Sequence, residues 1–102
     1  MALSGKSLDA ATTTGPGSVI SFDEPKSSIS LQVTTTGNPT YTVVVEVSLD
    51  GFHFFSGGGR TSDGITPMGL GAPTPVVAAR ANLTSLSGGT SPTVTAFVAA
   101  SD

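Results

Sequence analysis

The sequence contains no cysteine and no tryptophan, and its only histidine is His53. Without cysteine the chain can form neither a disulfide scaffold nor a thiolate metal site. Charge is scarce as well, because seven acidic and four basic residues make up only 11 % of the 102 residues, with a net charge of -3. Four basic residues are too few for the basic face that binds phosphates, so we expect no nucleic-acid partner.

Long apolar runs are also missing. The apolar residues 41–45 are interrupted by Thr42, and no apolar run of the chain comes near the roughly 20 residues that cross a bilayer. Residues 1–7 lack the basic start and the apolar stretch of about 7–15 residues that mark a secretion signal. We therefore expect a protein with no membrane partner that is kept in the cytosol or assembled there into something larger.

The chain is rich in hydroxyl and turn-forming residues, with 14 serines, 15 threonines, 13 glycines and 7 prolines. Residues that favour helices are scarce, whereas β-branched residues are common. Apolar residues alternate with polar ones: Ile29, Leu31 and Val33 share one face of a strand, and the odd positions of residues 41–49 are all apolar. This period of two predicts strands with one buried face.

Turn signals separate the alternating segments at intervals of about 8–12 residues, which is typical of a β-sandwich or a small barrel. We predict an all-β fold, an antiparallel β-sandwich of jelly-roll or Greek-key type with six to eight short strands. Residues 18–102 form this domain, and residues 1–17 form an N-terminal arm or edge segment. The predicted strands are a hairpin of residues 28–34 and 41–49, a second hairpin of residues 76–84 and 93–99, and shorter strands at residues 7–10, 18–22 and 52–55, with residues 56–75 as a long loop.

The aromatic segment Phe52, His53, Phe54 and Phe55 is the candidate interface. It follows Asp50-Gly51, a pair that favours a tight turn with positive φ at the glycine. In a strand, Phe52 and Phe54 would share one face, and His53 and Phe55 the other. Only one pair can enter the core. The other is covered by the following loop, buried in a partner, or exposed as a platform for sugars.

No constellation of residues predicts catalysis. His53 has no nucleophile elbow beside it, and residues 56–60 lack the lysine of a phosphate-binding loop. Asp50 and Asp63 flank the aromatic segment and could approach each other, but the acids do not have the spacing of a calcium loop. We predict that the protein is not an enzyme, with no catalytic residues, no cofactor and no metal site.

Two segments, residues 28–39 (SISLQVTTTGNP) and 79–95 (ARANLTSLSGGTSPTVT), resemble small proteins encoded among the structural genes of tailed bacteriophages, especially those of actinobacterial hosts. The resemblance spans residues 18–100. It implies a non-enzymatic virion protein, a capsid decoration or cement protein or a head fibre, that binds the shell through apolar surface. The implied partners are the major capsid protein or other virion proteins and further copies of the chain, with a trimer favoured. The implied location is the virion, assembled in the host cytoplasm.

A second resemblance leads to an alternative function. Residues 45–52 (VEVSLDGF) are similar to a strand and turn of jelly-roll domains, and also to discoidin-type and carbohydrate-binding modules. That similarity implies a carbohydrate-binding β-sandwich on a tail or fibre, which would serve adhesion to the host. The exposed aromatic residues of the segment 52–55 would then stack on sugar rings.

Overall fold

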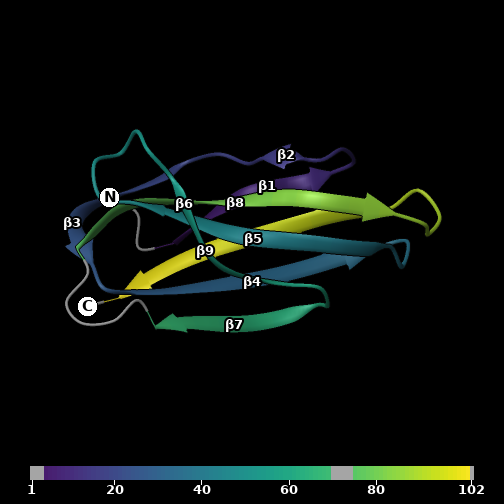
Figure 1. Ribbon diagram of the computed structural model, residues 1–102. Coiled ribbons are helices and arrows are strands. Elements are labelled where there is room, and N and C mark those ends of the chain that lie inside the picture. The colour runs from purple at the N-terminus through teal and green to yellow at the C-terminus, as the bar shows by residue number, and fades with distance from the viewer. Residues whose placement is uncertain (1–3, 70–74, 102) are drawn as a thin grey trace.

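The computed structural model describes residues 4–69 and 75–101, and in this part of the chain all regular structure is β. Two antiparallel sheets pack face to face into an elongated sandwich (Figure 1). The strands are β1 (Ser4–Ala11), β2 (Gly15–Pro16), β3 (Ile20–Lys26), β4 (Ser28–Thr36), β5 (Thr40–Ser48), β6 (Phe55–Arg60), β7 (Gly64–Gly69), β8 (Val76–Ser87) and β9 (Thr93–Ser101). The predicted antiparallel β-sandwich is confirmed, with nine strands in the described residues in place of six to eight. None of these residues belongs to a helix that could cross a bilayer.

The order of the strands is that of a jelly roll. One sheet runs β1-β9-β4-β7 and the other runs β2-β8-β5-β6, with β3 placed beyond β2 along the same edge of β8. Every connection crosses from one sheet to the other, except those from β2 to β3 and from β5 to β6. This double Greek-key path lets each strand bury one face against the opposite sheet.

The two predicted hairpins are wrong. Strand β4 pairs with β9, and β5 pairs with β8, so the partners predicted for each hairpin lie in different sheets. Alternation in a sequence identifies the face of a strand that is buried, but it does not identify the neighbouring strand. The chain instead crosses between the sheets in both turns, at residues 37–39 and 88–92.

These two crossover turns contact each other at one end of the sandwich. The Thr90 amide donates a hydrogen bond of 2.9 Å to the Gly37 carbonyl oxygen. Both Gly37 and Gly89 have positive φ, of 80° and 73°. A Cβ atom at Gly37 would lie 2.3 Å from the Thr90 carbonyl oxygen, and one at Gly89 would lie 2.4 Å from that of Gly37. Glycine is therefore required at both positions.

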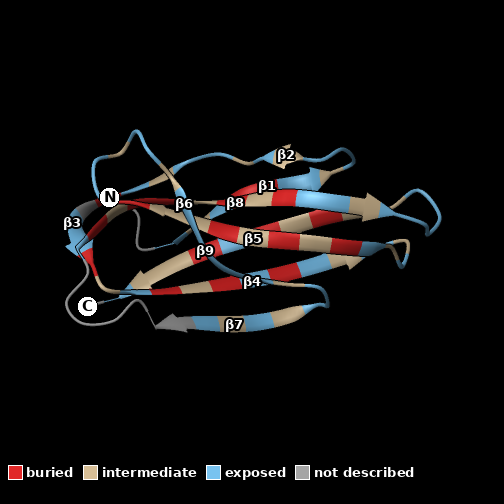
Figure 2. Cartoon of the chain, viewed as in Figure 1, coloured by how far each residue is buried: buried red, intermediate tan, exposed pale blue. Residues whose placement is uncertain are grey.

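The core lies between the sheets and follows the alternation in the sequence (Figure 2). Strand β4 is the plainest case, because Ile29, Leu31 and Val33 are at most 1 % exposed while Gln32 between them is exposed. The buried apolar residues of the sandwich are Leu8, Phe22, Ile29, Leu31, Val33, Tyr41, Val43, Val45, Val76, Ala78, Ala79, Ala81, Leu83, Val94, Ala96 and Val98.

Ser7 joins the two sheets along one side of the sandwich. This residue of β1 is buried, and its Oγ donates a 2.7 Å hydrogen bond to the Ser18 carbonyl oxygen and accepts a 2.8 Å bond from the Ala81 amide of β8. The Ser18 amide returns a 2.7 Å bond to the Ser7 carbonyl oxygen. Gly17 passes so close that a Cβ there would lie 2.0 Å from that same oxygen.

The predicted loop at residues 56–75 was also wrong in part, because it contains β6 and β7. Both are edge strands, where glycine and proline are tolerated since one side of the strand needs no ladder hydrogen bonds. The same reason explains why β3 continues through Pro25, beyond residue 22, where the strand was predicted to end. In the N-terminal segment 1–17, the described residues supply β1 and β2, which pair with β9 and β8.

Candidate functional site

The aromatic segment lies in a turn that is organised by the Asp50 carboxylate. Its Oδ1 accepts hydrogen bonds from the amides of Phe52 at 2.8 Å and His53 at 2.9 Å, and from Ser48 Oγ at 2.9 Å. Ser48 Oγ in turn accepts a 2.8 Å bond from the Gly51 amide. Gly51 has the predicted positive φ, of 84°. The backbone N–H of His53, followed by its side chain, holds the pKa of Asp50 well below its ordinary value.

This turn replaces the strand that was predicted for residues 52–55. Only Phe55 belongs to a strand, as the first residue of β6, so the predicted alternation of faces is wrong. The reason is local: an aspartate that caps the amides two and three residues ahead competes with strand pairing. His53 Nδ1 lies 2.7 Å from Asp50 Oδ2, and both side chains are exposed.

Most of the candidate interface is exposed to solvent. Phe52 is 84 % exposed, Phe55 is 71 % exposed and the neighbouring Leu49 is 58 % exposed. The described part of the loop predicted as a possible cover, residues 60–69 and 75, leaves Phe52 and Phe55 exposed, and the rest of that loop lies outside the described residues. We call residues 49–55 the aromatic turn. Beside it lies a shallow hollow with mainly apolar walls, lined by Val47, Leu49, Asp50, His53 and Phe55.

Phe54 differs from its neighbours because it fixes the aromatic turn to the sheet. Its half-buried ring lies against the Arg80 guanidinium, whose Cζ is 4.4 Å from the ring centroid. Arg80 Nε donates a 2.7 Å bond to Glu46 Oε1, and Asn82 Nδ2 donates a 3.1 Å bond to Glu46 Oε2. The turn is therefore held by Asp50 from within and by Phe54 against β5 and β8.

Asp63 has hydrogen-bond partners of its own, separate from those of Asp50. Its Oδ1 accepts bonds from Thr35 Oγ1 at 2.8 Å and Tyr41 Oη at 2.9 Å, and its Oδ2 accepts one from the Thr35 amide at 3.1 Å. Burial alone would raise the pKa of Asp63, but these hydrogen bonds outweigh it and the pKa is lowered. Burial, then the bond to Asp63, raises the pKa of Tyr41 to about 12. Among the described residues no three His, Asp or Glu side chains come together as a metal site.

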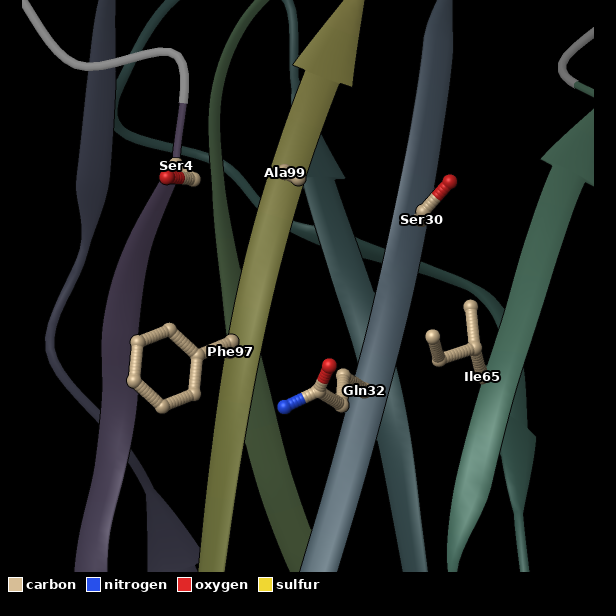
Figure 3. Close-up of a pocket in the computed structure, with 6 residues that line it drawn as sticks. All are labelled: Ser4, Ser30, Gln32, Ile65, Phe97 and Ala99. Carbon is tan, nitrogen blue, oxygen red and sulfur yellow. The ribbon is translucent and has the colours of Figure 1, made fainter.

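A second hollow, which was not predicted, lies on the outer face of the sheet β1-β9-β4-β7. Figure 3 shows Gln32 of β4 lying between the Phe97 ring of β9 and the Ile65 side chain of β7. Ser4, Ser30 and Ala99 complete its lining. The sequence predicts the position of Phe97, because Val94, Ala96 and Val98 face the core and Phe97 between them therefore faces outward. The sequence does not predict the position of Ile65, because the alternation that identifies strands is absent from residues 56–75 and predicts a loop there.

Comparison with known proteins assigns the chain to no group. No family model matches the sequence, and no curated protein matches it.

Proposed function

We propose that the protein is a non-enzymatic structural component of a virion, most specifically a capsid decoration protein, and that the aromatic turn is its attachment point. The observation that carries this proposal is the exposure of Phe52 and Phe55, at 84 % and 71 %, on a turn whose backbone is fixed by Asp50. Exposed apolar groups of this size mark interaction sites when they are gathered in one place.

The energetics favour binding to another protein. Covering a phenylalanine side chain contributes about 1.5–3 kcal/mol, and aromatic residues are common among those that dominate interface energies. The hydrogen bonds to Asp50 already hold the turn, so docking costs little additional ordering of the backbone. Even a weak contact becomes firm when many copies attach to one shell.

Two considerations support a virion as the setting. Residues 28–39 and 79–95 resemble small phage structural proteins, and the strand order is that of a jelly roll, an architecture that viral capsid domains use. The second consideration is an analogy of fold, which by itself names no function. The proposal therefore rests first on the exposed turn and only then on these likenesses.

No observation favours the carbohydrate-binding alternative to the same degree. Sugar sites present polar groups that are available to hydroxyls. In the hollow beside the aromatic turn, both Asp50 oxygens already have partners, the amides of Phe52 and His53 and the His53 ring. The remaining lining, Val47, Leu49 and Phe55, is apolar.

The test is cosedimentation of the purified chain with empty shells built from a major capsid protein of the same genome. We expect binding that Phe52→Ala with Phe55→Ala weakens at least about tenfold, which corresponds to about 1.4 kcal/mol. Phe97→Ala is the matched control, because it removes a partly exposed aromatic ring from a different face.

Three outcomes would overturn the proposal. The wild type could fail to bind the shells, the control could lose as much binding as the double variant, or the double variant could bind as well as the wild type. A glycan array probed with the wild type tests the alternative directly, and binding there that depends on Phe52 and Phe55 would replace the capsid proposal.

A further inference from the structure

The two sheets have four outer edges, and three of them carry features that prevent pairing with another strand. Strand β1 has Lys6 and two register shifts in its pairing with β9. Strand β7 contains Pro67. The edge formed by β2 and β3 contains Pro16 and Pro25. Lysine and proline are among the usual means by which proteins keep a sheet edge from joining another.

Strand β6 is the edge without proline or lysine. It pairs with β5 along one side and ends the sheet order β2-β8-β5-β6, and its residues 55–59 are exposed. Its pairing with β5 has one register shift, between the pairs Val45–Gly58 and Glu46–Ser56. The backbone donors and acceptors of the outer side of such a strand are available to a further strand.

The charges near β6 favour a second copy of this chain as that strand. Residues 55–59 are uncharged, so the net charge of -3 gives little repulsion where two copies would meet. Arg60, which ends the strand, is bound within its own turn by the carbonyl oxygens of Ser62, Asp63 and Ile65. A strand edge that meets the same edge of a copy is complementary to itself under a two-fold axis.

We infer that β6 pairs antiparallel with β6 of a second copy and joins two sheets into one continuous sheet. The glycines of β6 let the two backbones approach closely. The contact closes as a dimer, whereas the phage resemblance favoured a trimer. It is short compared with standard interfaces, so the dimer is weak and reversible. This inference does not depend on the proposed function.

The test combines sedimentation equilibrium over a dilution series with amide hydrogen exchange measured by NMR. The wild type is expected to dimerise at high protein concentration, with the β6 amides becoming protected as dimer forms. Gly57→Lys places like charges at the contact and is expected to raise the dissociation constant about fivefold or more. Gly57 is exposed and outside the left-handed region, so the lysine causes no backbone strain of that kind.

Thr13→Lys is the matched control, because it adds the same charge at an exposed position between β1 and β2. It is expected to leave both measurements unchanged, and Ser56→Lys repeats the test if Gly57→Lys fails to fold. The inference is overturned if the wild type stays monomeric at millimolar concentration. It is equally overturned if any oligomer forms while the β6 amides exchange freely, or if both lysine variants at the edge associate as the control does.

Discussion

The two sides of the sandwich are closed by different means. On the side of β1 and β3, the buried Ser7 hydroxyl connects the sheets through Ser18 and Ala81, and Gly17 lies against the Ser7 carbonyl group. On the side of β6 and β7, the sheets are linked by an exposed turn in which Arg60 and Asp63 bind backbone and hydroxyl groups.

The Ser7 side of the sandwich contributes to the stability of the fold, whereas the β6 side leaves groups exposed that can bind a partner. When the partner of a buried polar group is removed, the group stays buried without a hydrogen bond, and the fold bears the full cost of its desolvation. At the surface, water replaces the lost partner. Changes on the Ser7 side should therefore cost folding free energy. The β6 side and the aromatic turn can carry exposed apolar groups and an open strand edge because little of the fold depends on them.

Gly17→Ala should give the largest effect on stability. Its Cβ would lie 2.0 Å from the Ser7 carbonyl oxygen, so the backbone must move, and we expect a loss of about 3 kcal/mol. Gly57→Ala on the open side should change the free energy of unfolding by less than about 0.5 kcal/mol. Urea unfolding followed by circular dichroism measures both, and equal losses would contradict the comparison.

Ser7→Ala should come next. It leaves the Ala81 amide and the Ser18 carbonyl oxygen without the hydroxyl that serves both, at a cost of about 2 kcal/mol. Ser62→Ala removes an exposed hydroxyl that accepts a 3.3 Å bond from Arg60 on the other side, and it should be close to neutral. A destabilisation from Ser62→Ala as large as that from Ser7→Ala would show that the two sides do not differ.

Asp63→Asn should have a smaller effect than Gly17→Ala or Ser7→Ala, about 1 kcal/mol, because the amide keeps one acceptor oxygen and solvent screens the exposed group. The lowered pKa of Asp63 means that its contribution is present at neutral pH and is lost as pH falls through that pKa. The wild type should therefore lose more stability than the variant on acidification below about pH 4. Asp9→Asn, at an exposed surface ion pair, serves as the control.

The ultraviolet titration of Tyr41 tests the Asp63→Asn variant independently of stability. Tyr41 is the only tyrosine and the chain has no tryptophan, so the signal comes from this one side chain. Its pKa of about 12 in the folded protein favours the neutral phenol, so its contribution is complete below pH 10 and is lost as pH rises through 12. Removing the Asp63 charge should lower this pKa toward 10. An unchanged ultraviolet titration of Tyr41 would contradict the hydrogen bond assigned to Asp63.

The fold class could be predicted because alternation is a local property of the chain. Ile29, Leu31 and Val33 alternate with polar residues, and burial follows that pattern directly. The pairing of β4 with β9 could not be read in the same way, because both β5 and β9 offer β4 a suitable neighbour in sequence terms. Edge strands β6 and β7 were not predicted because they are rich in glycine or contain proline. These residues disfavour a central strand of a sheet but are tolerated in a strand at its edge.

The candidate site was predicted in composition but not in conformation. The four residues from Phe52 to Phe55 stood out by their aromatic character, and three of them are exposed. The strand assigned to them failed because one side chain, Asp50, binds the amides of Phe52 and His53. The spacing Ser48-x-Asp50-Gly51 carried that signal, since serine and aspartate before a glycine commonly cap a turn.

The pairing of β4 with β9 has a consequence for how the chain folds. Ser28 pairs with Ser101 and Thr36 with Thr93, so each sheet depends on contacts between distant parts of the sequence. Such topologies fold in milliseconds to seconds, well behind helical proteins of the same size. Because β9 and β8 are inner strands of the two sheets, neither sheet can be completed during synthesis before these last strands have left the ribosome, and only the pairs β4–β7 and β5–β6 can form earlier.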